Sequence, residues 1–324
     1  MFSRRLVVCL AFLIAIELEG GQLACAQRPA VGLTTADAVS LVTRDGVQLK
    51  ITYFPASVRK GSPQAKQVTP VVLLPDYKGS RAVFAQLAQK LLAAGETERD
   101  KVSFAAVTVD LRGHGESLKQ SLANGSQVDL DPSKLSKDDL IAMATADLDA
   151  VRSFLVDKND AGELNLSKLC LVGSGMGASV AANWALTDWS YPPLAVGKQG
   201  QDVRAIVLLS PRWTYNGLTM QGPMQFQALK KNVAWMLISG DKDPKVQTDI
   251  GRIKKQLERF HPTPAGKKPA RPSGLTILGL QTKLQGDSLI TQNAPTTEKE
   301  IVQFLIDNVA KTDVPWISRR NRLP

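Results

Sequence analysis

Residues able to carry out acid–base or nucleophilic chemistry are sparse in this chain. Only two of its 324 residues are histidines, His114 and His261. A metal site with three histidine ligands cannot be built from two. Any general base must be one of these two, or a carboxylate, a lysine or another group. Ser174 lies in a glycine-rich run, and Asp241 and Asp243 lie in a second turn-like run.

The first 26 residues are typical of a secretory signal peptide. Arg4 and Arg5 precede an apolar run at residues 6–16, and Ala-Cys-Ala follows at residues 24–26. The apolar run is too short to span a membrane as a helix. Its order of basic, apolar and small residues predicts export to the periplasm or the extracellular space. Retention of this segment as a membrane anchor is the alternative.

The composition is that of a folded protein. Hydrophobic residues make up 44% of the chain, which is enough to bury a core and excludes collagen-like and disordered classes. Cys170 is the only cysteine after residue 26, and its apolar surroundings predict a small buried side chain rather than a reactive thiol. No zinc-finger spacing, RNA-binding motif or phosphate-binding loop occurs. We therefore expect no metal, no cofactor and no nucleic acid.

Alternating strand and helix patterns must position the candidate residues. Two strand patterns around an Asp45-Gly46 turn, at 38–43 and 47–54, predict a β-hairpin. Apolar runs typical of buried parallel strands follow at 70–74, 102–109, 169–172, 203–209, 233–238 and 275–280. Helical patterns occur at 80–94, 136–155, 176–186, 248–260 and 297–310, with a weaker one at 225–231. Gly95 is the expected end of the first helix.

This order of elements predicts an α/β fold. The sheet should be mostly parallel and doubly wound, with helices on both faces and an antiparallel hairpin at its N-terminal side. Ligands of such sheets lie at the carboxyl ends of the strands. No linker or internal repeat is evident, so we interpret residues 27–310 as one domain and residues 311–324 as a basic C-terminal tail.

Four segments at the predicted strand ends resemble the α/β-hydrolase family and occur in that family's order. They are VVLLPDYKGS at 71–80, DLRGHGES at 110–117, LVGSGMG at 171–177 and GDKDP at 240–244. The resemblance covers nearly the whole mature chain and implies an α/β-hydrolase fold. The segment 210–222, where relatives often carry a lid, is short. A short or absent lid implies an open cleft, in which Trp213 and Tyr215 could line a ligand groove.

The nucleophile of that family is missing at the matching position. In its G-x-S-x-G frame, Gly173 and Gly177 match the outer glycines, which puts Gly175 where the serine should stand. Pro75-Asp76 occupy the positions where the family commonly has His-Gly in its oxyanion loop. Proline brings no backbone N–H, and a carboxylate opposes the stabilisation of an oxyanion.

The general base is missing as well. The resemblance implies a histidine after residues 275–280, yet no histidine follows His261. The acid turn persists, with Asp243 as the first candidate for the acid and Asp241 as the second. His114 belongs to a turn that is mostly structural in the family. A serine–lysine pair formed with Lys78 or Lys283 is conceivable, but no spacing supports it.

We therefore predict a secreted α/β-hydrolase homologue that is catalytically inactive and acts by binding in the cell envelope. The alternative is a weak or atypical serine hydrolase, esterase-like or peptidase-like, that uses Ser174 with Asp243. His261 is a further candidate base, although a surface loop position is the simpler interpretation.

Basic residues gather late in the chain, and their sign leaves anionic partners open. The net charge is +10, and the stretch Arg252–Arg271 holds seven basic residues against one acid. The tail adds Arg319, Arg320 and Arg322. Both regions could attract anionic envelope polymers or lipid head groups. A solvated helix and loop surface is the alternative.

Overall fold

A computed structural model describes residues 36–97, 102–192, 194, 197–261 and 274–319. All of them belong to one unit that spans Thr34–Pro324. The proposed signal peptide, residues 1–26, lies outside the described residues, as does the stretch 262–273 of the basic region. Within the described part, no helix is long and apolar enough to cross a membrane.

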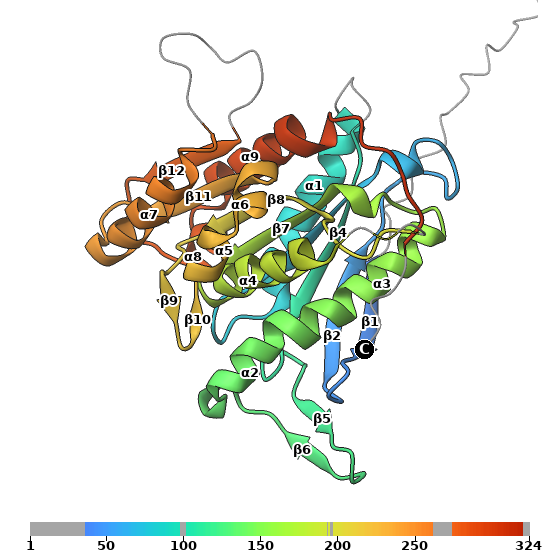
Figure 1. The fold of residues 1–324 in the computed structure, drawn as a ribbon, viewed down its shortest axis with the longest axis horizontal. Helices are drawn as coiled ribbons and strands as arrows, with labels where there is room; N and C mark the ends of the chain where they lie inside the picture. The colour runs from blue at the N-terminus through green and yellow to red at the C-terminus, as the bar shows by residue number, and fades with distance from the viewer. Residues whose placement is uncertain (1–35, 98–101, 193, 195–196, 262–273, 320–324) are drawn as a thin grey trace, which may run out of the picture. The chain divides into compact units, whose positions relative to one another are not determined.

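The centre of the fold is an eight-stranded sheet with the order β1-β2-β4-β3-β7-β8-β11-β12 (Figure 1). Strands β1 and β2 form the predicted antiparallel hairpin, and β2 pairs antiparallel with β4. From β4 to β12 the neighbouring strands are parallel. The strands are β1 (Asp37–Val42), β2 (Gln48–Phe54), β3 (Thr69–Leu74), β4 (Phe104–Asp110), β7 (Leu169–Ser174), β8 (Val203–Leu209), β11 (Ala234–Gly240) and β12 (Leu275–Leu280).

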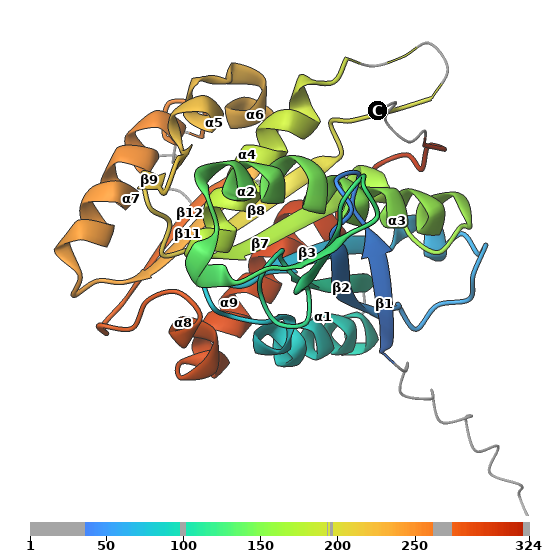
Figure 2. The ribbon, with the colours of Figure 1, turned by 90° about the horizontal axis from the view of Figure 1, so that it is seen from below.

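Helices cover both faces of the sheet, as the alternation predicted (Figure 2). Successive side chains of a strand point to opposite faces, so Val72 and Leu74 of β3 join one apolar cluster while Val71 and Leu73 join the other. The first cluster lies under α3 (Leu148–Asp160), α4 (Met176–Ser190) and α7 (Pro244–Leu257). The second lies under α1 (Ala85–Thr97), α8 (Ser288–Thr291) and α9 (Ala294–Leu305).

The predicted helix at 136–155 consists of two α-helices joined by a π-helical stretch. Ser136 caps α2 (Lys137–Ala142) through a reciprocal pair of hydrogen bonds with Asp139. A π-helical stretch, Met143–Asp147, then leads into α3. The weaker pattern near 225–231 corresponds to α5 (Gln221–Gln225) and α6 (Gln227–Asn232).

One predicted helix end was wrong. Gly95 does not terminate α1, which continues to Thr97. A Cβ on Gly95 would come within 2.7 Å of the Val102 carbonyl oxygen. The glycine is therefore explained by the close approach of the helix to the chain entering β4, rather than by a helix cap.

Two short hairpins were not predicted from the sequence. One joins β5 (Lys119–Ser121) to β6 (Gln127–Asp129) and extends below α2 in Figure 1. The other joins β9 (Thr214–Tyr215) to β10 (Leu218–Thr219) in the segment where relatives often carry a lid. The lid region is thus short, as expected.

Candidate functional site

Three loops meet at the carboxyl edge of the sheet, where ligands of such folds bind. They follow β3, β7 and β12, and side chains join them across long sequence separations. The loop after β3 supplies Asp76, the loop after β7 supplies Gly175, and the loop after β12 supplies Asp287. We call this arrangement the elbow site.

The turn after β7 has the sharp geometry of a nucleophile elbow without the nucleophile. Gly175 has φ 47° and ψ −103°, a combination that side-chain-bearing residues rarely adopt. Its N–H donates to the Leu209 carbonyl oxygen over 2.9 Å, which ties the turn to β8. Helix α4 begins at the next residue, Met176. The strand–turn–helix frame is therefore intact, and glycine suits its strained position.

The Asp76 carboxylate fills the space that a side chain at position 175 would need. A Cβ built on Gly175 overlaps the carboxylate carbon and both carboxylate oxygens of Asp76. Asp76 Oδ1 accepts hydrogen bonds of 2.7 Å from the N–H groups of Met176 and Tyr77. In this frame such N–H groups stabilise an oxyanion. Here an internal carboxylate occupies them.

Asp287 was missed by reasoning from the sequence. Its Oδ1 accepts a 3.0 Å hydrogen bond from the Asp76 N–H. The loop that carries it is fixed to the ends of β8 and β11: Gly286 N–H donates to Ser210 Oγ, and Gln285 Nε2 donates to the Gly240 carbonyl oxygen, each over 2.9 Å. The available signal was position alone, because Asp287 lies in the loop where the family's histidine is expected.

Burial dominates the titration of both carboxyls. It raises the pKa of Asp76, although the N–H groups of Met176 and Tyr77 oppose the rise. Burial also raises the pKa of Asp287, and the neighbouring Asp76 charge adds to that rise. Both groups are therefore protonated more readily than an ordinary aspartate.

Ser174 and the two aspartates of the acid turn are not brought together as a catalytic set. Ser174 is fully buried; its hydroxyl lies near Asp287 but makes no hydrogen bond of ordinary geometry. Asp243 accepts from the N–H groups of Lys245 and Val246 and thereby caps α7. Asp241 accepts from the Gln281 amide. Among hydrogen bonds within the described ranges, none joins Ser174 to Asp243.

The two histidines lie at different ends of the sheet. His114 is buried; its Nδ1 pairs with the Arg112 carbonyl oxygen at 2.9 Å, and its ring lies edge-on to Tyr77. Burial lowers its pKa. His261 Nε2 pairs with the Lys230 carbonyl oxygen at 2.7 Å, and the ring abuts Gly274, just before β12 begins. His261 is therefore at the opposite strand end from the elbow site.

The remaining candidate groups lie around this site without completing it. The Lys78 ammonium lies over the Tyr77 ring, and Lys283 is exposed. Tyr215 of β9 is half-buried, which raises its pKa to about 12, and the charge of Asp76 adds to the rise. Trp213 instead packs under the Arg252 guanidinium, 3.7 Å from the ring centre. Within the described ranges, no three His, Cys, Asp or Glu side chains cluster in a way that could hold a metal.

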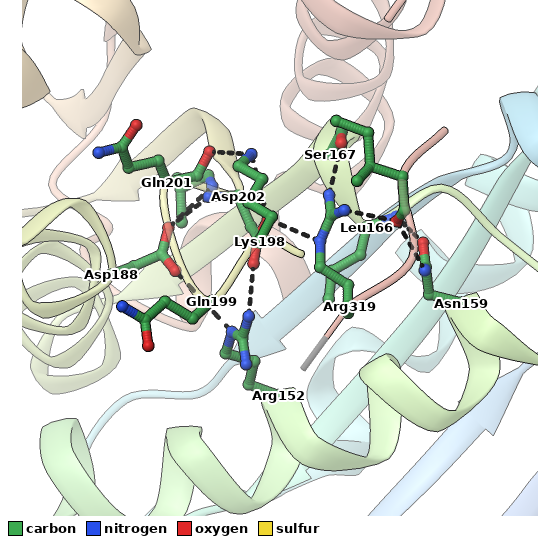
Figure 3. Close-up of polar contacts among 12 residues, drawn as sticks. Arg152, Asn159, Leu166, Ser167, Asp188, Lys198, Gln199, Gln201, Asp202 and Arg319 are labelled. Carbon is green, nitrogen blue, oxygen red and sulfur yellow. Dashed lines mark hydrogen bonds and ion pairs between the residues drawn. The ribbon is translucent and has the colours of Figure 1, made fainter. Parts of the chain in front are cut away.

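In the described part of the basic tail, Arg319 does not contribute to a basic surface. The Arg319 side chain is fully buried, pairs with Asp202 at 3.1 Å and donates to Ser167 Oγ (Figure 3). Arg152 pairs with the same Asp202 at 2.9 Å. Upstream, the Asn165 amide donates to the Val314 carbonyl oxygen. Val314 and Arg319 of the predicted tail are thus joined to the preceding domain, and the buried Asp202 carboxylate explains why Arg319 points inward.

Comparisons with known proteins agree with this geometry. The alpha/beta hydrolase family model matches residues 71–277. No curated protein sequence matches the chain significantly. Among solved structures, an esterase from Pyrococcus furiosus is 14% identical, with a TM-score of 0.51 and coverage of 85% of this chain and 92% of that one.

Two further solved structures share the fold. DcsB in complex with its substrate analogue is 12% identical, with a TM-score of 0.54 over 85% of this chain and 100% of that one. A 2,6-dihydroxy-pseudo-oxynicotine hydrolase is 13% identical, with a TM-score of 0.52 over 88% and 72%. At such identities these likenesses show the fold alone. The family model that matches residues 71–277 places the chain in the alpha/beta hydrolase family, and the sheet order and the elbow frame agree with it.

Proposed function

We propose that this protein is a non-hydrolytic member of its family, in which the elbow site is closed by its own Asp76. The observation that carries the proposal is the Asp76 carboxylate, which overlaps the side-chain position of Gly175 and accepts the Met176 N–H. Serine hydrolysis needs a nucleophile, a base and free oxyanion donors. The first is replaced by glycine, and the donors are already occupied.

No other base takes the position of the family's histidine. The loop after β12 presents Asp287 rather than a histidine, and His261 lies at the other end of the sheet. A buried carboxyl with a raised pKa is a possible general base in principle. Without a nucleophile at position 175, however, it has no serine hydroxyl to activate there.

The accompanying proposal is export followed by binding to an anionic polymer of the cell envelope. Its support is the signal-like segment 1–26 together with α7 and the turn that follows it, where Lys245, Lys254, Lys255 and Arg259 are exposed. None of these four takes part in an ion pair within the described ranges. Export predicts that the mature protein recovered from outside the cytoplasm begins at Gln27, which mass spectrometry of its N-terminus would check.

Labelling with a fluorophosphonate probe tests the absence of hydrolysis. The mature protein should remain unlabelled and should not hydrolyse p-nitrophenyl butyrate at enzyme-like rates. Gly175→Ser alone should also stay unlabelled, because Asp76 overlaps the new side chain. A Gly175→Ser/Asp76→Gly double variant removes that overlap and frees both N–H donors, so any recovered labelling should appear only there.

The alternative, a weak hydrolase that uses Ser174 with Asp243, has one observation in its favour. The Ser174 hydroxyl in the elbow turn makes no hydrogen bond of ordinary geometry. The same experiment separates the two functions. Labelling of the unaltered protein at Ser174, lost in Ser174→Ala and accompanied by ester hydrolysis, would establish the alternative and overturn the proposal.

A further inference from the structure

A cavity of about 500 Å³ lies at the amino-terminal edge of the sheet, at the opposite strand ends from the elbow site. Its described walls come from the starts of β8, β11 and β12, the end of α6, and the segment that follows α9. A volume of this size accommodates a small organic molecule. The charges along its walls indicate which class of molecule fits.

Two cations line the cavity without a carboxylate in contact. Arg204 of β8 and Lys231 of α6 form no ion pair within the described ranges. Arg204 Nε donates to the Ser167 carbonyl oxygen over 3.2 Å, and its two terminal nitrogens have no hydrogen-bond partner among the described residues. Burial lowers the pKa of this guanidinium, although the charges of Asp202 and Asp188 oppose the fall. A half-buried cation with free donors favours the approach of an anion.

The residues around the Arg204 guanidinium restrict its position. Its Cζ lies 6.0 Å from the centre of the Trp189 ring, and the Trp189 indole N–H donates to the Val203 carbonyl oxygen over 3.0 Å. Ser167 accepts from Arg204 through its carbonyl oxygen and from the buried Arg319 through its hydroxyl (Figure 3). These contacts orient the guanidinium before a ligand arrives, which lowers the entropic cost of binding.

The remaining described walls combine apolar surface with two titratable side chains. Val314 and Pro315 supply apolar surface from the segment after α9. Asp313 of the same segment is exposed, and its carboxylate accepts from the Gln67 amide at 3.5 Å. His261 lines the opposite part of the chain's path, just before β12. Among the described lining residues, the two cations therefore outnumber the acids.

From this arrangement we infer that the cavity binds a small organic anion, whose carboxylate or phosphate group is held by Arg204 and Lys231 and whose apolar part contacts Val314 and Pro315. Guanidinium donors match the paired oxygens of either anionic group. The inference is independent of hydrolysis at the elbow site and of polymer binding by α7, because it rests on other residues at the other strand ends.

The imidazole NMR signals of the two histidines test this in the mature protein. His261 lines the cavity, whereas His114 lies beyond the opposite strand ends and serves as an internal control. Benzoate and phenyl phosphate are the carboxylate and phosphate probes, and benzamide is the uncharged counterpart of benzoate. At least one of the two anions should shift the His261 signals saturably and leave those of His114 unchanged. Benzamide should bind at least about tenfold more weakly than that anion, because it lacks the charge.

The identity of the anion that binds distinguishes a carboxylate ligand from a phosphate ligand. Acetate and inorganic phosphate test the apolar part of the ligand, because they carry the same anionic groups without the ring. Each should bind at least about tenfold more weakly than its aromatic counterpart. Equal affinities would overturn the assignment of an organic ligand.

Substitution of the two cations tests their role. Arg204→Gln should weaken binding of the anion by about tenfold, and Lys231→Gln by about threefold, since the lysine is exposed. Lys134→Gln is the matched control, because it makes the same change at an exposed position between β6 and α2. It should bind like the unaltered protein. A His261→Gln variant assigns the two imidazole signals.

Three results would each overturn the inference. They are unchanged His261 signals with both anions, benzamide binding as tightly as the anions, and Lys231→Gln binding as tightly as Lys134→Gln. Because Lys231 is exposed, its variant keeps the test decisive even if Arg204→Gln does not fold.

Discussion

Glycine at position 175 holds the backbone in a conformation that other residues adopt only under strain. The positive φ of 47° and the adjacent Asp76 carboxylate each oppose a side chain there. Any substitution at this position is therefore destabilised twice, by backbone strain and by overlap with Asp76. The backbone strain alone is worth about 1–3 kcal/mol for a residue forced into such a region.

Gly175→Ala should accordingly lower the free energy of unfolding by at least about 1 kcal/mol. Gly251→Ala is the control, because Gly251 is an exposed residue within α7 and a Cβ there would meet no atom within 4 Å. That change should raise stability by about 0.5–1 kcal/mol, since alanine favours a helix. Urea unfolding monitored by circular dichroism measures both. Equal effects of the two substitutions would contradict the strained elbow.

Individual site residues could be predicted from the sequence where they belong to a local motif. The frame around Gly175 and the position of Asp76 after β3 could be predicted, because both follow apolar strand runs at fixed offsets. Asp287 could not be predicted as a member of the site. It contacts Asp76 across a separation of 211 residues, and no local pattern encodes that pairing.

At the scale of elements, the segment after α9 is held to the rest of the domain by a buried charge network. Arg319 lies between Asp202, which also binds Arg152 and Lys198, and the Ser167 hydroxyl. The Arg319 backbone N–H donates to Asp160. Buried ion pairs of this kind are costly to break, because one charge is left poorly compensated.

Arg319→Ala should destabilise the protein by up to about 3 kcal/mol, the lower end of the range for a broken buried pair, since Asp202 retains two other cations. Lys134→Ala is the control, because its pair with Asp131 is exposed and long, at 3.8 Å. It should change stability by less than about 0.5 kcal/mol. Thermal denaturation of both variants checks this, and a near-neutral Arg319→Ala would show that the segment is not held by its charge.

The sequence predicted the strands of the large sheet and most of its helices. Long apolar runs and a 3.6-residue period are strong signals because burial requires them. The β5–β6 hairpin carries no such signal: its short strands are polar and largely exposed. The burial of Arg319 was not predicted for a related reason. Its neighbours in sequence are basic, and the acid that it pairs with, Asp202, is distant in sequence.

At the scale of the whole molecule, the described basic residues are of two kinds: some are buried in ion pairs, and others are exposed and unpaired. The cations around Asp202 are internal and compensated, whereas those on the outer face of α7 are exposed. Within the described residues, the outer face of α7 is thus one place where unpaired positive charge meets solvent. Attraction of an anionic polymer should depend on the α7 face and should weaken as salt is added.

Lys254→Glu/Lys255→Glu should elute from immobilised dextran sulfate at a lower salt concentration than the unaltered protein. Lys134→Glu/Lys299→Glu changes the net charge by the same amount at exposed positions away from α7. It should elute close to the unaltered protein. If both double variants shift equally, the retention reflects net charge alone, and the α7 face has no special role.

The overlap between Asp76 and position 175 has an evolutionary consequence. A serine introduced at 175 meets the carboxylate and a strained backbone, and so is selected against while Asp76 remains. Removal of Asp76 alone leaves two N–H donors without their acceptor and restores no nucleophile. Each single step toward a catalytic elbow is thus unfavourable while the other position is unchanged. Such sign epistasis makes a return to hydrolysis by successive point mutations improbable, however well the fold is preserved.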